Sequence, residues 1–373
     1  MMKALLWILG VLALVAGLGA AGRWYATGYM HRKAVTPKSL GNATPAAESI
    51  PFSRVAFASG DRTLIGWWVR APDDSARRAP AVLFFHGNGA AISDYVAFQK
   101  FFHRQGISTL SFDYTGFGAS GGMPSLENAV DDAAAAARVF SDSAGTDARK
   151  VAFGSALGAT VLLQAIDSVQ PHVSGVVIEG VAASVRDAAV REGHIPPLVA
   201  PLLVDIANNV AAARRVRVPL LAVHSREDNR IPLESAERVV EAVRGRAVLV
   251  PHWRPGHSAL LTSSRPCDWQ PVLEFIRSGA LPSMPVDAAD PCSTMMADST
   301  AADTVKTDTT IADTAATDTT TADTVTSASS ALSASSNLAF FCVAVLGAKL
   351  RAPRLSEPGG CNQGELPPPS SSS

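Results

Sequence analysis

The stretch Val151-Ala152-Phe153-Gly154-Ser155-Ala156-Leu157-Gly158-Ala159 decides the fold of this chain. It begins as a short apolar strand, passes through a tight turn with two glycines, and continues as an apolar helix. This spacing is that of a nucleophile elbow, a strained turn that exposes one side chain between two positions that must be small. Gly154 and Gly158 meet this demand only when the exposed position is 156, which holds alanine.

Strand-like and helix-like runs alternate on both sides of the elbow. The expected strands are residues 54–58, 64–70, 81–85, 108–112, 151–153, 175–178, 220–224 and 247–250. The expected helices are residues 91–105, 126–141, 156–168, 233–244 and 271–278. This interleaving predicts an α/β fold with a doubly wound, mostly parallel sheet of about eight strands. The turn Ser59-Gly60-Asp61-Arg62 separates the first two strands, so we expect an antiparallel hairpin at one edge.

Composition excludes several classes of protein. The chain has 373 residues and a net charge of −1, which excludes a nucleic-acid binder that works through bulk positive charge. Its four cysteines show no Cys-x-x-Cys spacing, which excludes a zinc ribbon and a disulfide-stapled miniprotein. We see no motif for a metal or a cofactor and expect neither. The oligomeric state is left open.

The N-terminal segment, residues 1–33, predicts a membrane helix. From Ala4 to Gly22 the chain has 19 residues without a charged or polar side chain, and as a helix they span about 28 Å, close to the hydrocarbon thickness of a bilayer. Trp24 and Tyr25 follow, where interfacial aromatic residues are usual. The run is long for a signal peptide, which favours an uncleaved single-pass anchor. The alternative is export after cleavage near Gly19-Ala20-Ala21. Basic residues on both sides leave the orientation open.

Three further segments complete the expected organisation. Residues 34–50 form a linker, residues 51–280 form the α/β domain, and residues 281–373 form a low-complexity tail. In the tail an aspartate recurs every five residues from Asp298 to Asp323, with no large apolar residue at a fixed place. Stacked repeats would therefore bury no core, and we predict that the tail is disordered. Its apolar patch at residues 338–346 is too short to span a bilayer.

Residues 50–280 resemble the α/β-hydrolase family, most closely its serine-aminopeptidase-like branch. The resemblance rests on the elbow and on three further landmarks in the family's order. His86-Gly87-Asn88-Gly89 is similar to the oxyanion loop, and the segment from Asp113 to Ser120 is similar to the family's Asp-Tyr-x-Gly-x-Gly-x-Ser. Asp228 follows a strand, as the family's triad acid does, and His257 lies in a Pro-Gly-His sequence that resembles the site of the triad histidine.

The resemblance implies a role for each candidate residue. Ala156 occupies the nucleophile position, Asp228 is the acid with Glu227 as the runner-up, and His257 is the base. The backbone N–H groups of Asn88 and Leu157 would bind the oxyanion.

Other residues near these landmarks receive no catalytic role. Ser155 is rejected as the nucleophile because Phe153 and Leu157 would then fill the two positions that must be small. His252 is expected not to be catalytic, and Asp113 is expected to hold the loop after its strand.

Two functions remain open at this point. The first is a relative of serine hydrolases, for ester, thioester or amide bonds, that is inactive or severely impaired because alanine has no nucleophilic oxygen. The second is a non-catalytic binding protein that uses the hydrolase pocket for a small acyl or peptide ligand or for a partner. Residues 182–217 would form a small lid, with a helix at residues 204–213 and a solvated basic face at Arg214, Arg215 and Arg217. The substrate cannot be predicted from them.

Overall fold

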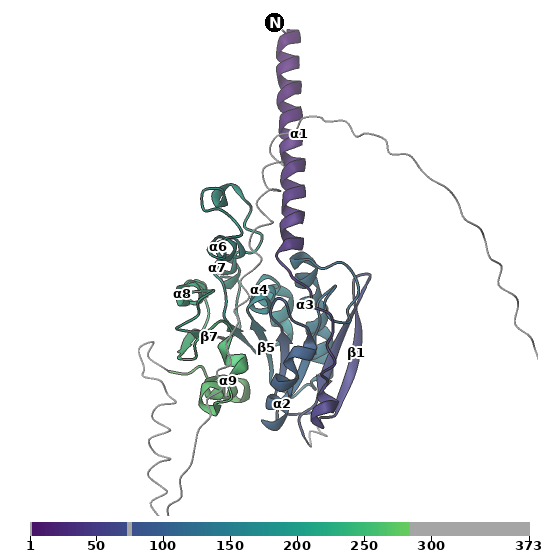
Figure 1. Ribbon diagram of the computed structural model, residues 1–373, viewed down its shortest axis with the longest axis vertical. Helices are drawn as coiled ribbons and strands as arrows, with labels where there is room; N and C mark the ends of the chain where they lie inside the picture. The colour runs from purple at the N-terminus through teal and green to yellow at the C-terminus, as the bar shows by residue number, and fades with distance from the viewer. Residues whose placement is uncertain (1, 73–76, 284–373) are drawn as a thin grey trace, which may run out of the picture. The chain divides into compact units, whose positions relative to one another are not determined.

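The computed structural model describes residues 2–72 and 77–283, so the predictions for the tail beyond residue 283 lie outside the described residues. Eight strands form one sheet in the order β1-β2-β4-β3-β5-β6-β7-β8 (Figure 1). The strands β1, β2 and β4 pair antiparallel, and all other neighbours pair parallel, which confirms the predicted α/β-hydrolase type of sheet. The strand bounds are β1 Phe52–Ser59, β2 Arg62–Val69, β3 Ala81–Phe85, β4 Ser108–Phe112, β5 Lys150–Ser155, β6 Gly175–Glu179, β7 Leu220–Ser225 and β8 Ala247–His252.

Helices cover both faces of this sheet, because alternate residues of a strand point to opposite sides. In β3, Leu83 and Phe85 belong to one core, which α3, α4 and α8 close. Val82 and Phe84 belong to a second core, which α2 and α9 close. Strands buried on both faces read as continuous apolar runs, as the sequence does here. The helix bounds are α1 Met2–Lys33, α2 Val96–Arg104, α3 Leu126–Ser143, α4 Leu157–Gln164, α5 Ile166–Val169, α6 Val185–Arg191, α7 Asn209–Ala213, α8 Leu233–Ala242 and α9 Pro266–Ser278.

The predicted edge hairpin is present. Strands β1 and β2 pair in a register that places Ser59 opposite Arg62, so the loop between them is Gly60-Asp61. Gly60 has a φ of 60°, a conformation that glycine adopts at no steric cost. A two-residue loop of this kind matches the twist of the strands that it joins.

Some helices differ from the predicted bounds. Helix α9 begins at Pro266 rather than at residue 271, because a proline in the first helical position loses no intrahelical hydrogen bond. The helix expected at residues 204–213 is only α7. Its start is fixed by Asn208, whose side chain accepts a hydrogen bond from the N–H of Ala211 and caps the helix there.

The N-terminal helix continues past the apolar run that ended at Gly22. Part of α1, Leu9–Lys33, is 25 residues of a length and composition that could cross a membrane, as an anchor or a signal sequence would. The segment after it, residues 34–50, carries a short 3₁₀ helix at Pro45–Glu48. It also hydrogen-bonds to the domain, since the N–H of Gly118 donates to the carbonyl of Lys38 (2.8 Å).

Candidate active site

The elbow at the end of β5 holds Ala156 in a strained backbone conformation. Its φ and ψ are 51° and −110°, between the last residue of β5 and the first residue of α4. Few residues other than glycine adopt a positive φ, and such strain persists only where the surroundings impose it. The N–H of Ala156 donates to the carbonyl of Glu179 in the neighbouring strand (2.9 Å), which fixes the turn against the sheet. The Ala156 side chain is partly exposed.

Two glycines make this turn possible. A Cβ atom at Gly154 would lie 2.6 Å from the carbonyl oxygen of Gly158, and a Cβ atom at Gly158 would lie 1.9 Å from the carbonyl oxygen of Phe85. The atoms that would be struck belong to the backbone, which cannot rotate out of the way. The requirement for small residues on both sides of position 156 therefore has a direct steric cause.

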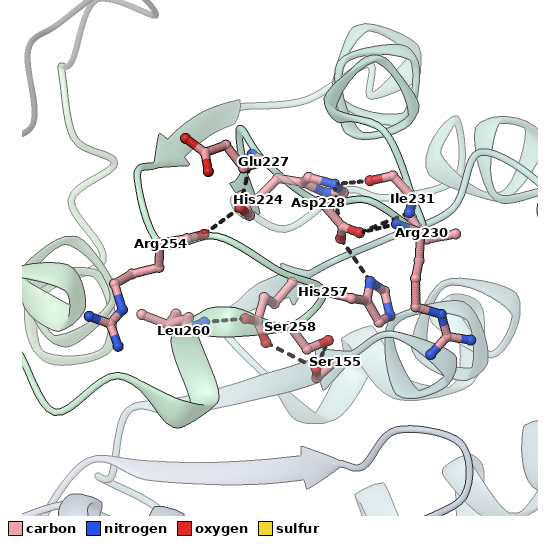
Figure 2. Close-up of polar contacts among 12 residues, drawn as sticks. Ser155, His224, Glu227, Asp228, Arg230, Ile231, Arg254, His257, Ser258 and Leu260 are labelled. Carbon is pink, nitrogen blue, oxygen red and sulfur yellow. Dashed lines mark hydrogen bonds and ion pairs between the residues drawn. The ribbon is translucent and has the colours of Figure 1, made fainter. Parts of the chain in front are cut away.

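An aspartate and a histidine meet at the end of β7, as Figure 2 shows. Asp228 Oδ2 lies 2.7 Å from His257 Nδ1, and its Oδ1 accepts hydrogen bonds from the N–H groups of Arg230 and Ile231, each at 2.9 Å. Burial by itself would raise the pKa of Asp228, but these hydrogen bonds, with that of His257 the largest, outweigh it and lower the pKa. The carboxylate is therefore charged at neutral pH and favours the proton of His257 on Nδ1, which leaves Nε2 as the basic atom.

A buried glutamate behind this pair was not singled out by sequence reasoning. Glu179, the last residue of β6, accepts hydrogen bonds from Ser155 Oγ and from the N–H of Leu260, each at 2.9 Å. Burial raises the pKa of Glu179 to about 7. The carboxyl group thus joins the elbow strand to the loop that carries His257. The signal in the sequence was an acidic residue that ends an otherwise apolar strand.

Ser155, next to the elbow, is turned into this network. Its side chain is buried, with 1% of the residue exposed, and its Oγ also lies 3.0 Å from Ser258 Oγ. Ser258 itself has a positive φ of 53° beside His257. A hydroxyl that is buried and bonded to a carboxyl is poorly placed to attack a substrate.

The two expected oxyanion donors lie at the two sides of the elbow. A Cβ atom at Gly87 would be 3.8 Å from Ala156 Cβ, so the loop that contains Asn88 packs against the turn. Leu157 is the first residue of α4, where backbone N–H groups have no partner within the helix. Neither the N–H of Asn88 nor that of Leu157 donates to an acceptor within the described part of the chain. Both are therefore available to a ligand oxygen.

The other residues near the landmarks make contacts of their own. Glu227 is exposed and is held through its backbone, while Asp228 is the residue that contacts His257. His252 is buried, and its Nδ1 accepts from the N–H of Arg254 (3.3 Å). Asp113 is buried under the oxyanion loop, where Oδ1 accepts from the N–H of Ile92 (2.8 Å).

A second buried histidine adjoins the acid. His224 Nε2 lies 2.9 Å from the carbonyl oxygen of Ile231, to which it donates, and 3.6 Å from Asp228 Oδ2. Burial lowers the pKa of His224, so it is neutral at pH 7 and supports the loop of Asp228 without adding charge. Within residues 2–72 and 77–283, no group of three or more histidine, cysteine or acidic side chains is placed to hold a metal ion.

The sheet order and the elbow define the α/β-hydrolase class of protein. Comparison with known proteins agrees: residues 76–211 match the family model of serine aminopeptidase S33, and residues 204–290 match that of TAP-like proteins. The chain is 31% identical to Rv2307c of Mycobacterium tuberculosis over 65% of its own length and 86% of that protein. It is 26% identical to YfhR of Escherichia coli K12, over 55% of its own length and 72% of that protein. This chain belongs to the α/β-hydrolase family.

Solved structures support the fold. The esterase Pf2001 of Pyrococcus furiosus superimposes with a TM-score of 0.54 at 18% sequence identity, over 66% of this chain and 98% of the esterase. At that level of identity the likeness concerns the path of the backbone and not the reaction.

Proposed function

We propose that this chain is a relative of serine hydrolases whose site suits an ester, thioester or amide carbonyl but lacks the nucleophilic oxygen. One observation carries the proposal: Ala156 occupies the strained turn between two glycines that tolerate no side chain. Three contacts support it: Asp228 and His257 are bonded to each other, the loop of His257 is tied through Ser258 to Ser155 beside the elbow, and the loop of Asn88 packs against Ala156.

With a serine at position 156, the chemistry would follow from this geometry. The hydroxyl would pass its proton to Nε2 of His257 while its oxygen attacks the carbonyl carbon, and the carbonyl oxygen would become an oxyanion. The N–H groups of Asn88 and Leu157 would bind that oxyanion. When the tetrahedral intermediate collapses, the imidazolium would return the proton to the leaving group. Asp228 would stabilise the imidazolium throughout.

Alanine stops this sequence at its first step, because a methyl group has neither a proton to give nor a lone pair to attack with. The remaining parts can still bind a carbonyl oxygen. In serine proteases that lack a member of the triad, such parts leave about 10³–10⁴-fold acceleration over water, far below a working enzyme. His257 could activate a water molecule, but slowly.

A non-catalytic binding role is the second candidate, and it is favoured by the N–H groups of Asn88 and Leu157, which have no acceptor among the described residues. The His257 ring is partly exposed as well. Together they form a polar end that would hold the oxygen of an acyl group or of a carboxylate.

The substitution Ala156→Ser tests the proposal. The unmodified chain should not react with fluorophosphonate probes and should hydrolyse p-nitrophenyl acetate barely above background. The Ala156→Ser variant should be labelled. Loss of the nucleophile alone costs about 10⁶ in turnover in a serine protease, and imperfect placement by about 1 Å costs about 10². We therefore expect a gain of about 10⁴ in esterase activity.

Matched variants separate the roles of His257, Asp228 and Ser155. In the Ala156→Ser background, His257→Ala removes the base and Asp228→Asn favours the wrong tautomer, so each should abolish most of the gain. Ser155→Ala should leave labelling of the Ala156→Ser variant in place. Labelling of the unmodified chain that disappears in Ser155→Ala would place the nucleophile one residue earlier. A folded Ala156→Ser variant without activity would instead favour the binding role.

A further inference from the structure

The chain that follows α1 is fastened to the oxyanion loop. The N–H of Thr36 donates to Asn88 Oδ1 (2.7 Å), and Asn88 Nδ2 donates to the carbonyl of Ala34 (3.3 Å). The N–H of Gly89 donates in turn to the carbonyl of Thr36 (3.0 Å). Helix α1 ends at Lys33, one residue before the first of these contacts. The apolar run of α1 ends at Gly22, so residues 23–33, about 16 Å of helix, separate it from this segment, and a membrane that holds α1 would face this side of the domain.

The segment expected to form the lid, residues 182–217, lies at the same edge of the sheet, and we call it the lid. Asn88 follows β3, the segment that bonds to Lys38 follows β4, and the lid follows β6. These three strands are parallel, so their carboxyl ends share one edge. The lid is also tied to the site, because Glu192 Oε1 pairs with Arg230 (2.6 Å), whose backbone N–H binds Asp228.

The lid carries an exposed apolar run, residues 195–204, which we call the apolar lid segment. Its ten residues contain no charged or hydrogen-bonding side chain. Leu198 is 89% exposed and Val199 is 38% exposed. A long apolar run on the surface of a protein marks a contact with another protein or with a membrane.

Most backbone N–H groups of this segment are either absent or paired within the described residues. Three of its residues are prolines, which have no N–H to satisfy. The N–H groups of Val199 and Ala200 donate to the carbonyl of Pro196, and the N–H of Leu203 donates to the carbonyl of Ala200. Internally paired polar groups are what a segment needs in order to enter a lipid environment, where unsatisfied backbone groups are costly.

We propose that the apolar lid segment inserts into the surface of the bilayer that α1 enters, and that the site takes an acyl group of a membrane lipid. The claim about the ligand rests on the proposed function, whereas the membrane contact stands on the lid itself. A leucine and a valine that gain lipid contact favour the interface, as apolar residues of interfacial segments do. The acyl chain would then reach the site without crossing water.

Photocrosslinking of the full chain in vesicles of phosphatidylcholine and phosphatidylglycerol tests the contact. The photoreactive residue p-benzoylphenylalanine would replace Leu198, or Thr146 as a matched exposed control at the opposite edge of the sheet, just before β5. Replacement of Trp24 in α1 is the positive control. We expect about tenfold more lipid adduct at position 198 than at position 146. Equal, low adduct at both positions, a crosslink between two protein chains, or a purified chain that begins near Ala21 would overturn the proposal.

A second experiment tests the ligand. The measured quantity is the rate of hydrolysis of a long-chain ester in vesicles divided by the rate for a short soluble ester, both in the Ala156→Ser background. Leu198→Asp should lower this ratio about tenfold, because burial of a leucine is worth about one decade or more in affinity. Thr146→Asp should leave this ratio as it is. An unchanged ratio in Leu198→Asp would reject a lipid-borne ligand. If Ala156→Ser hydrolyses neither ester, the proposed function and the acyl ligand fail together, and the adduct at position 198 still decides the membrane contact.

Discussion

Replacement of Gly158 by alanine sets two physical effects against each other. Gly158 lies in the first turn of α4, where alanine ordinarily stabilises a helix by about 1 kcal/mol relative to glycine. Here the new Cβ atom would be 1.9 Å from the carbonyl oxygen of Phe85 and 2.8 Å from that of His86. The propensity of alanine predicts a gain in stability, and the contact predicts a loss.

The size of the loss follows from the overlap. Ordinary contact begins at 3.4 Å, so α4 and the end of β3 would have to separate by about 1.5 Å. Insertion of a carbon atom into a packed core costs about 1–3 kcal/mol, and more where only backbone can yield. With a cost of about 4 kcal/mol for this backbone contact, and after subtraction of about 1 kcal/mol of helix propensity, we expect a net loss of about 3 kcal/mol. For a domain of this size, that corresponds to a fall of about 6–12 °C in melting temperature.

The fall in melting temperature can be measured by heating the full chain in detergent at a fixed scan rate and monitoring its circular dichroism. Gly245→Ala is the matched control, because a Cβ atom there would lie 3.7 Å from the nearest carbonyl oxygen. That variant should melt within about 2 °C of the wild type or slightly above it, since alanine restricts the unfolded chain. A Gly158→Ala variant that melts at or above the wild-type temperature would refute the steric account of the elbow.

Two further outcomes follow from the fold. The pKa of Glu179 is raised to about 7 from the ordinary value of 4.5, so the folded state holds this proton more tightly than the unfolded state does. The stability contributed by this tighter proton binding is fully present below pH 4.5. It amounts to roughly 3 kcal/mol in the free energy of unfolding, and it is lost as the pH rises to about 7. Urea unfolding should therefore show the wild type losing stability relative to Glu179→Gln between pH 5 and about 7, and parallel curves would contradict the burial of this carboxyl. The full chain should also stay in the membrane fraction through a wash in high salt, since salt screens charges and not apolar contact. Soluble protein that begins near Ala21 or Gly22 would instead support a cleaved signal sequence.

Much of the fold could be predicted from the sequence because each strand and turn is specified by its own residues. The strands β3 to β7 are buried on both faces and read as short apolar runs between turn residues, so their positions follow from the pattern. The hairpin turn at Gly60 is read from its own residues. The bounds of α7 and α9 were harder to predict, because Asn208 and Pro266 act as helix starts only in their particular surroundings.

The parallel sheet, the elbow with alanine at position 156, and the chain order of the candidate acid and histidine could all be predicted from the sequence alone. These depend on spacing and on the two glycines, which are visible in one dimension. The folded structure was needed to show that Asp228 rather than Glu227 contacts His257, and that Glu179 joins Ser155 to the loop after His257. Those residues are 24 to 81 positions apart in the chain. Contacts of this kind arise when separate strands end at one edge of a sheet, and no local pattern encodes the direction in which their side chains then turn.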